Sequence, residues 1–338
     1  MPDDALDPRT VTADYHRVVG PGSLDETHTV VLGGVPQVVT IRGRRPDLPV
    51  LVLVHGGPGS PLSGTSWMWQ RPVEEYFTVV HHDQRGAGRS HALTDPEQVR
   101  PTLTIDRFVD DLVELLEWLT DHLGVAEVAL LGHSWGSVVA TRATLARPDL
   151  VSVYVGVGQV VSMPEGERAS WRWARRQAEA VGDDEAAAGL DDLLPYPGDR
   201  DTFVEKLYAE RRWVQRLGGF AAHRDHGDYY GRGYVLAPDH SDAEIESADA
   251  GNRFSADAVA SRLLDVDLGD VTSFPVPMVQ VLGRHDRMTP PELVGPWLDA
   301  MDVSCVVEWF EHSAHLAMYE EPGHFLLTLL EHVRPHTA

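Results

Sequence analysis

Five residues around Ser134 have the pattern expected of a nucleophilic serine. They are Gly132-His133-Ser134-Trp135-Gly136, and they stand between the apolar run 128–131 and the helix-compatible run 138–146. A serine on a sharp turn between a strand and a helix holds its hydroxyl clear of the sheet, and flanking glycines avoid collision with neighbouring chain. The pattern predicts that Ser134 attacks an electrophilic carbon; an ordinary glycine-rich turn is the alternative.

Such a serine needs two partners, because its hydroxyl is nearly inert at neutral pH. A histidine must accept the proton, and a carboxylate must orient the imidazole. In folds that have this kind of turn, the carboxylate comes later in the chain than the serine, and the histidine comes later still. Asp286, after the apolar run 276–282, is the predicted acid, although a turn-capping carboxylate would also suit that place. His315 is the predicted base, and His312, directly after the run 303–310, is the competing candidate.

Attack on a carbonyl places negative charge on its oxygen, which two fixed backbone N–H groups can stabilise. One should be the amide of Trp135, directly after the nucleophile, and the other should come from the loop 55–59, which reads His-Gly-Gly-Pro-Gly. Glycine lets the backbone approach a substrate closely. We predict that Gly57, rather than Gly56, supplies the second amide; a plain turn is the alternative.

The elements that must position these residues can be found from apolar runs and their periodicity. Short continuous runs predict buried strands, and apolar residues at helical spacing predict a helix over 103–123. Their alternation predicts an α/β fold with a mostly parallel central sheet and helices on both faces. The predicted strands are 49–54, 77–81, 128–131, 151–157, 276–282 and 303–310, preceded by an antiparallel hairpin over 29–42.

The chain changes character after residue 157, where about a hundred residues rich in Arg, Glu, Asp, Trp and Tyr interrupt the pattern. This segment predicts an inserted helical cap, with helical pieces at 169–180 and 202–217. The expected organisation is an N-terminal extension over 1–28, a first part of the core over 29–160, the cap over 161–265 and a second part of the core over 266–338.

Composition narrows the classes of partner. A net charge of −24 opposes encounter with nucleic acid or an anionic membrane, so neither is expected as a partner. The start lacks the basic and apolar regions of a signal peptide, no apolar run reaches the length of a membrane helix, and the single Cys305 allows no internal disulfide. These features predict a cytoplasmic protein; the oligomeric state is left open.

Several motifs together resemble the α/β-hydrolases of the proline iminopeptidase (prolyl aminopeptidase) family, or a related branch of it. They occur in matching order from about residue 29 to the end. The resemblance implies an α/β-hydrolase fold, a Ser134, Asp286, His315 triad and release of an N-terminal residue, often proline, from small substrates. The motifs are His55-Gly56-Gly57-Pro58-Gly59, Asp83-Gln84-Arg85-Gly86-Ala87-Gly88-Arg89-Ser90, Gly132 to Ser137, Gly283-Arg284-His285-Asp286 and Ser313-Ala314-His315.

In that family, glutamates of the cap bind the free amine of the substrate. Glu165 and Glu167 are the corresponding candidates here, with Gln159 as a further substrate-binding candidate, although an acidic start of a helix would place glutamates there for dipole reasons alone. The polar segment 223–228 could offer metal ligands but is better explained as a loop of the cap. No metal and no cofactor are expected.

The sequence therefore predicts a serine hydrolase that cleaves small amide or peptide substrates, most simply an aminopeptidase, through an acyl-enzyme. An esterase, lactonase or thioesterase with the same triad is the alternative, since both leaving groups use the same machinery. A ligand receptor without catalytic activity is a remote third possibility.

Overall fold

The computed structural model describes residues 7–224 and 228–337. Its described strands form one eight-stranded sheet in the order β1-β2-β4-β3-β5-β6-β7-β8, in which β1 and β2 run antiparallel to their neighbours and the other pairs are parallel. The strands are β1 (Leu24–Leu32), β2 (Val35–Gly43), β3 (Val50–Val54), β4 (Thr78–Asp83), β5 (Val128–His133), β6 (Val151–Val157), β7 (Met278–Gly283) and β8 (Cys305–Phe310).

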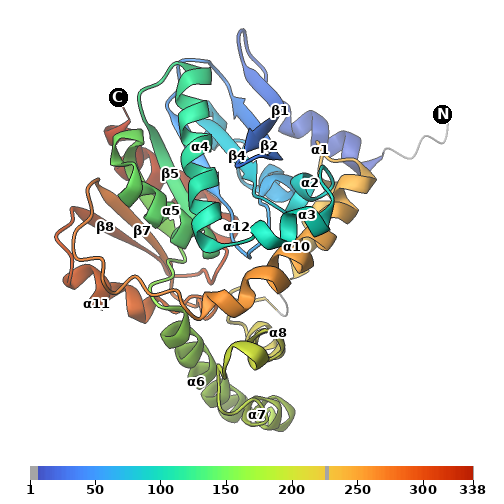
Figure 1. The fold of residues 1–338 in the computed structure, drawn as a ribbon, viewed down its shortest axis with the longest axis vertical. Coiled ribbons are helices and arrows are strands. Elements are labelled where there is room, and N and C mark those ends of the chain that lie inside the picture. The colour runs from blue at the N-terminus through green and yellow to red at the C-terminus, as the bar shows by residue number, and fades with distance from the viewer. Residues whose placement is uncertain (1–6, 225–227, 338) are drawn as a thin grey trace.

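Helices cover both faces of this sheet, and further helices lie beyond one end of it (Figure 1). Together with the sheet topology, this arrangement confirms the predicted α/β-hydrolase architecture. The helices are α1 (Pro8–His16), α2 (Gly88–His91), α3 (Pro96–Val99), α4 (Ile105–Leu123), α5 (Trp135–Ala146), α6 (Met163–Val181), α7 (Asp184–Asp191), α8 (Arg200–Arg216), α9 (Asp228–Gly233), α10 (Asp242–Leu263), α11 (Val294–Asp299), α12 (Ala317–Glu320) and α13 (Pro322–Thr328).

The alternation of side chains along β3 creates two hydrophobic cores. Val52 and its alternate neighbours pack against α4, α5 and α11 on one face of the sheet, whereas Leu51 and Leu53 pack against α12 and α13 on the other. All five β3 residues are buried, as expected of a central strand covered on both sides. Burial on both faces fixes the strand ends, and thereby the loops that carry the predicted site.

The described helices α6 to α10 come between β6 and β7 in the chain, and α6, α7 and α8 project beyond the end of the sheet (Figure 1). Those three helices have a small core of their own, built from Ala174, Ala178, Leu190 and Trp213 with their neighbours. None of the helices in the described part of the chain is long and apolar enough to cross a membrane.

Two elements differ from the sequence expectation. The hairpin begins at Leu24 rather than residue 29, because the polar residues 25–28 extend β1 along the partly exposed edge of the sheet. Helix α10 was not predicted; its sequence has few large apolar residues and includes Gly251. Ser241 and Glu244 form a capping box at its start, and that spacing was the local signal for it.

Candidate active site

Ser134 occupies the turn between β5 and α5 with an unusual backbone conformation. Its φ of 54° and ψ of −126° lie outside the regions that residues with a side chain normally adopt. The flanking glycines permit this turn, since a Cβ on Gly132 would lie 2.6 Å from Ser137 Cα and one on Gly136 would collide with the Val54 carbonyl oxygen. The turn holds Ser134 at the carboxyl end of the central strands.

Asp286 and His315 form a buried pair at the same end of the sheet. His315 Nδ1 lies 2.9 Å from Asp286 Oδ2, and both side chains are almost completely buried. The carboxylate also accepts the backbone N–H groups of Met288 and Thr289 on Oδ1, at 2.8 and 3.0 Å, and the Thr289 hydroxyl on Oδ2, at 2.8 Å. Because an ionised carboxylate can only accept, the contact fixes a proton on Nδ1 of His315.

The ionisation of Asp286 follows from these contacts. Burial alone would raise the pKa of its carboxyl group, but the interaction with His315 and the hydrogen bonds from Thr289 outweigh burial and lower that pKa. Asp286 is therefore a stable anion that can orient an imidazole and stabilise its protonated form.

The loop that carries His315 is fixed from several sides. Glu320 accepts the N–H of Ala314, while Glu321 accepts the N–H of His312 and the Ser313 hydroxyl. The structure thus places His315 on Asp286 and His312 in the outer part of the loop, where its ring has no contact with Asp286 among the described hydrogen bonds and ion pairs.

The loop after β3 lies against the serine turn. Gly57 has a φ of 110°, which favours glycine, and it lines the same cavity as Ser134 and Trp135. Among the described residues, neither the Gly57 nor the Trp135 N–H has a hydrogen-bond acceptor outside regular helix and strand bonding. Both amides are therefore available to an oxyanion.

Gln84 ties this loop to the serine turn. Its side-chain amide donates to the His55 carbonyl oxygen at 2.8 Å and accepts the Trp135 indole N–H at 3.3 Å, while its backbone N–H donates to His55 Nε2 at 3.1 Å. Burial lowers the pKa of His55 to about 4, so its ring stays neutral and can accept that bond. The sequence marked Gln84 only as part of a motif.

Gly158 is a site residue that the sequence reasoning missed. It follows β6 with a φ of 57°, and a Cβ there would lie 2.9 Å from Thr289 Oγ1, 3.2 Å from Asp286 Oδ2 and 3.3 Å from His315 Cε1. Glycine is therefore required for the Asp286–His315 pair to pack this closely against the strand end.

Two cavities meet at the serine turn. One of about 140 Å³ is lined by both Ser134 and His315, and the other, of about 310 Å³, extends from Ser134 to the cap residues Leu207, Tyr208 and Arg211. The second cavity is mostly apolar and suits a small substrate rather than a folded protein.

Comparison with known proteins shows the family to which the chain belongs. The family model described as alpha/beta hydrolase fold matches residues 49–322. The chain belongs to the alpha/beta hydrolase family. This hydrolase is 31% identical to a probable aminopeptidase (YbaC) of Bacillus subtilis (strain 168) over 90% of its length and 95% of the relative's. It is 26% identical to a proline iminopeptidase of Heyndrickxia coagulans, over 83% of this chain and 88% of that one.

A solved structure gives the same fold. The proline iminopeptidase-related protein of Thermus thermophilus superimposes with a TM-score of 0.64 at 23% identity, over 93% of this hydrolase and 98% of that chain. The kinship with these hydrolases makes the chain an enzyme of the serine hydrolase class, as the sequence predicted.

The cap of this hydrolase carries a buried charged cluster beside the larger cavity. Arg211, which lines that cavity, pairs with the carboxylates of Glu167 and Glu210, and the Tyr196 hydroxyl also donates to Glu167. Burial, together with the nearby Glu167 charge, raises the pKa of Glu210. The predicted candidate Glu167 is thus held by Arg211 behind the cavity wall rather than free in the cavity.

The other predicted cap candidates lie elsewhere. Glu165 is exposed on α6 and pairs with Arg168, and it lines none of the described cavities. Gln159 is buried and bonds to the Tyr154 hydroxyl and the Val160 carbonyl oxygen, so its polar atoms serve the packing of β6. Two of the considered metal ligands, at positions 225 and 226, lie outside the described residues.

Proposed function

We propose that this chain is an aminopeptidase-type serine hydrolase that releases the N-terminal residue from small amide or peptide substrates. The observation that carries the proposal is the buried Asp286–His315 pair, 2.9 Å apart, of which His315 lines a common cavity with the strained Ser134. The relatives named as an aminopeptidase and as a proline iminopeptidase support the choice of an N-terminal amide bond.

In the proposed acylation, Ser134 Oγ attacks the carbonyl carbon of the scissile amide while His315 Nε2 takes the hydroxyl proton. The negative oxygen of the tetrahedral intermediate accepts hydrogen bonds from the Gly57 and Trp135 amides. Asp286 keeps the imidazole in the tautomer that can accept at Nε2 and stabilises the imidazolium that forms. His315 then gives its proton to the leaving amine, the C–N bond breaks, and the acyl group remains as an ester of Ser134.

In the proposed deacylation, a water molecule loses a proton to His315 and attacks the ester carbon. The same two amides hold the second oxyanion, and the C–O bond to Ser134 breaks as His315 returns the proton to the serine oxygen. The reaction uses only side chains, backbone amides and water, and the cavity under the cap would limit substrates to small molecules or short peptides.

One observation favours a second candidate, an ester hydrolase with the same triad. Among the described residues that line the 310 Å³ cavity, Arg211 is the one charged side chain, and none of these lining residues is an aspartate or a glutamate. A protonated substrate amine would therefore rely on the cluster behind the wall, where Arg211 already pairs with Glu167. A neutral ester needs no such partner.

Three substrates distinguish the two candidates: proline p-nitroanilide, its N-acetylated form and a p-nitrophenyl ester. Cleavage of the free-amine anilide alone supports the aminopeptidase, and cleavage of the ester alone supports the second candidate. Ser134→Ala is the blank, and Ser304→Ala, on an exposed serine, is the matched control. Absence of turnover together with absence of fluorophosphonate labelling at Ser134 would overturn both.

The cap cluster can be tested with a matched pair of variants on one helix. If the Glu167 carboxylate supports amine binding, Glu167→Gln raises KM for the free-amine anilide but not for the ester. Glu165→Gln, two residues away and exposed, leaves both unchanged. Equal effects of Glu167→Gln on both substrates would reject amine recognition by this cluster.

A further inference from the structure

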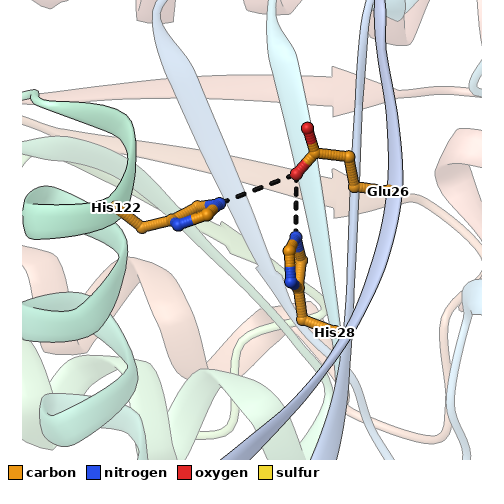
Figure 2. A group of neighbouring side chains, drawn as sticks. All are labelled: Glu26, His28 and His122. Atoms are coloured by element: carbon orange, nitrogen blue, oxygen red, sulfur yellow. Dashed lines mark hydrogen bonds and ion pairs between the residues drawn. The ribbon is translucent and has the colours of Figure 1, made fainter.

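Two histidines and a glutamate meet at a place remote from Ser134. Glu26 and His28 belong to β1, and His122 belongs to the last turn of α4 (Figure 2). Because α4 ends just before β5 begins, this place lies toward the amino ends of the parallel strands, whereas Ser134 follows the carboxyl end of β5. The proposed hydrolysis makes no use of these three residues.

The three side chains converge on one point. Glu26 and His28 are two positions apart on a strand and therefore point to the same face. Glu26 Oε2 lies 2.8 Å from His28 Nε2 and 3.6 Å from His122 Nε2, and one ligand atom from each residue lies within 4.8 Å of the others. Figure 2 shows both imidazoles directed at the same carboxylate oxygen.

An aromatic side chain orients both imidazoles. The Trp118 ring stacks on His122 with centroids 4.6 Å apart and an interplanar angle of 11°, and it meets His28 edge-on at 5.5 Å. Trp118 and His122 are one helical turn apart, so the stack is set by the helix itself. The imidazoles are thus held in place before any ion arrives, which lowers the cost of ordering ligands.

The side chains are also accessible from solvent. The exposed fractions are 31% for His28, 34% for His122 and 40% for Glu26. One carboxylate oxygen and two imidazole nitrogens therefore face a point that water can reach.

We propose that Glu26, His28 and His122 form a binding site for a divalent transition-metal ion of the zinc class. Two imidazoles with one carboxylate oxygen are a ligand set that zinc accepts, with water in the fourth position. The ion takes the place of the proton between His28 Nε2 and Glu26 Oε2, and that proton moves to Nδ1 of His28 or to solvent. Hard cations such as Mg²⁺ prefer oxygen ligands and do not suit this set.

Metal binding would join two elements that belong to different parts of the sequence. β1 is an edge strand with a single partner, β2, and α4 packs across it. An ion bound to the folded state and not to the unfolded chain stabilises the folded state in proportion to the logarithm of its concentration. The site would therefore fasten the edge strand to the helix and raise the melting temperature, without effect on the hydrolytic site.

The test is titration of the full chain, first freed of metal by a chelator, with Zn²⁺ by calorimetry and with Co²⁺ by visible absorption. We expect one saturable site whose affinity for Zn²⁺ falls by about tenfold or more in His122→Ala, His28→Ala and Glu26→Gln. Changes to residues that merely orient metal ligands already cost about tenfold or more in affinity, so loss of a ligand should cost at least as much. His223→Ala is the matched control, because His223 lies in another histidine cluster, 4.8 Å from His285 between ring centroids.

A second measurement separates binding from folding. Zn²⁺ should raise the melting temperature of the wild type and of His223→Ala but not of His122→Ala, whose melting temperature without metal reports whether it folds. Unchanged affinity in all three ligand variants, loss of the site in His223→Ala instead, or no saturable binding to the wild type would each overturn the proposal.

Discussion

Replacing Asp286 by asparagine tests the proposed catalytic pair most directly. Oδ1 of Asp286 accepts two backbone N–H groups, from Met288 and Thr289, so the asparagine oxygen must take that position. The NH₂ group then takes the place of Oδ2, 2.9 Å from His315 Nδ1. Because an amide nitrogen donates, Nδ1 must become the acceptor, and the ring proton moves to Nε2.

A proton on Nε2 prevents His315 from accepting the proton of Ser134. In a serine triad this error of tautomer lowers kcat by about 10⁴, equivalent to about 5.4 kcal/mol of transition-state stabilisation. The fold should survive, because the amide matches the carboxylate in shape and the Thr289 hydroxyl can rotate to accept. Thr289→Val, which removes one of four donors to the carboxylate, should cause a much smaller loss.

The assay is the rate of Ser134 labelling by a fluorophosphonate, which needs no knowledge of the substrate, followed by kcat/KM on whichever chromogenic substrate is cleaved. Glu311→Gln is the matched control, since Glu311 is an exposed carboxylate at the start of the His315 loop. Labelling of Asp286→Asn within tenfold of wild type, or an equal loss in Glu311→Gln, would refute the assigned role of Asp286.

Three further outcomes are expected. Gly158→Ala should lower kcat at least about tenfold and destabilise the fold by about 1 kcal/mol or more. The reason is that the φ of Gly158 is 57° and that the added Cβ would crowd Thr289. A variant with wild-type kinetics and melting temperature would contradict this. Burial raises the pKa of Cys305 to about 11, so only about one thiol in a thousand is ionised at pH 8. Maleimide should therefore label Cys305 far more slowly in the native chain than in the urea-unfolded chain. Equal labelling rates would refute this. Burial lowers the pKa of His55 to about 4 and of His133 to about 3, so both rings stay neutral in the folded chain but gain protons in the unfolded chain below pH 6.5. The free energy of unfolding should therefore fall by about 1 kcal/mol for each histidine between pH 7 and pH 5.5. Urea unfolding curves that coincide at the two pH values would contradict this.

Most of the fold could be predicted because its signals are local. The central strand β3 is a continuous apolar run, and α4 carries apolar residues at regular helical spacing. Helix α10 lacks such a stripe, because it packs closely through small residues: Ser247 and Ser255 donate hydrogen bonds to the carbonyl oxygens of Gly88 and Gly86. Contacts of that kind leave no periodic pattern in a sequence.

Some residues of the candidate site could likewise be predicted from the sequence, and others could not. The serine turn, the Gly57 loop and the order of Asp286 and His315 follow from residue types and spacing. The choice between Glu165 and Glu167 does not, because both stand at the start of one helix, and only the fold places Arg211 of α8 beside Glu167. An acidic residue at a helix start has the same sequence pattern whether it faces solvent or an ion partner.

The sequence by itself determined most of the individual strands, the turn that exposes Ser134 and the residue types of a serine hydrolase, since each depends on neighbours within a few positions along the chain. Tertiary structure alone decided which groups meet: Asp286 with His315, Arg211 with Glu167, and His122 with Glu26. Those pairs lie tens of residues apart in sequence, and their separation in space is set by how helices and strands pack rather than by any local preference.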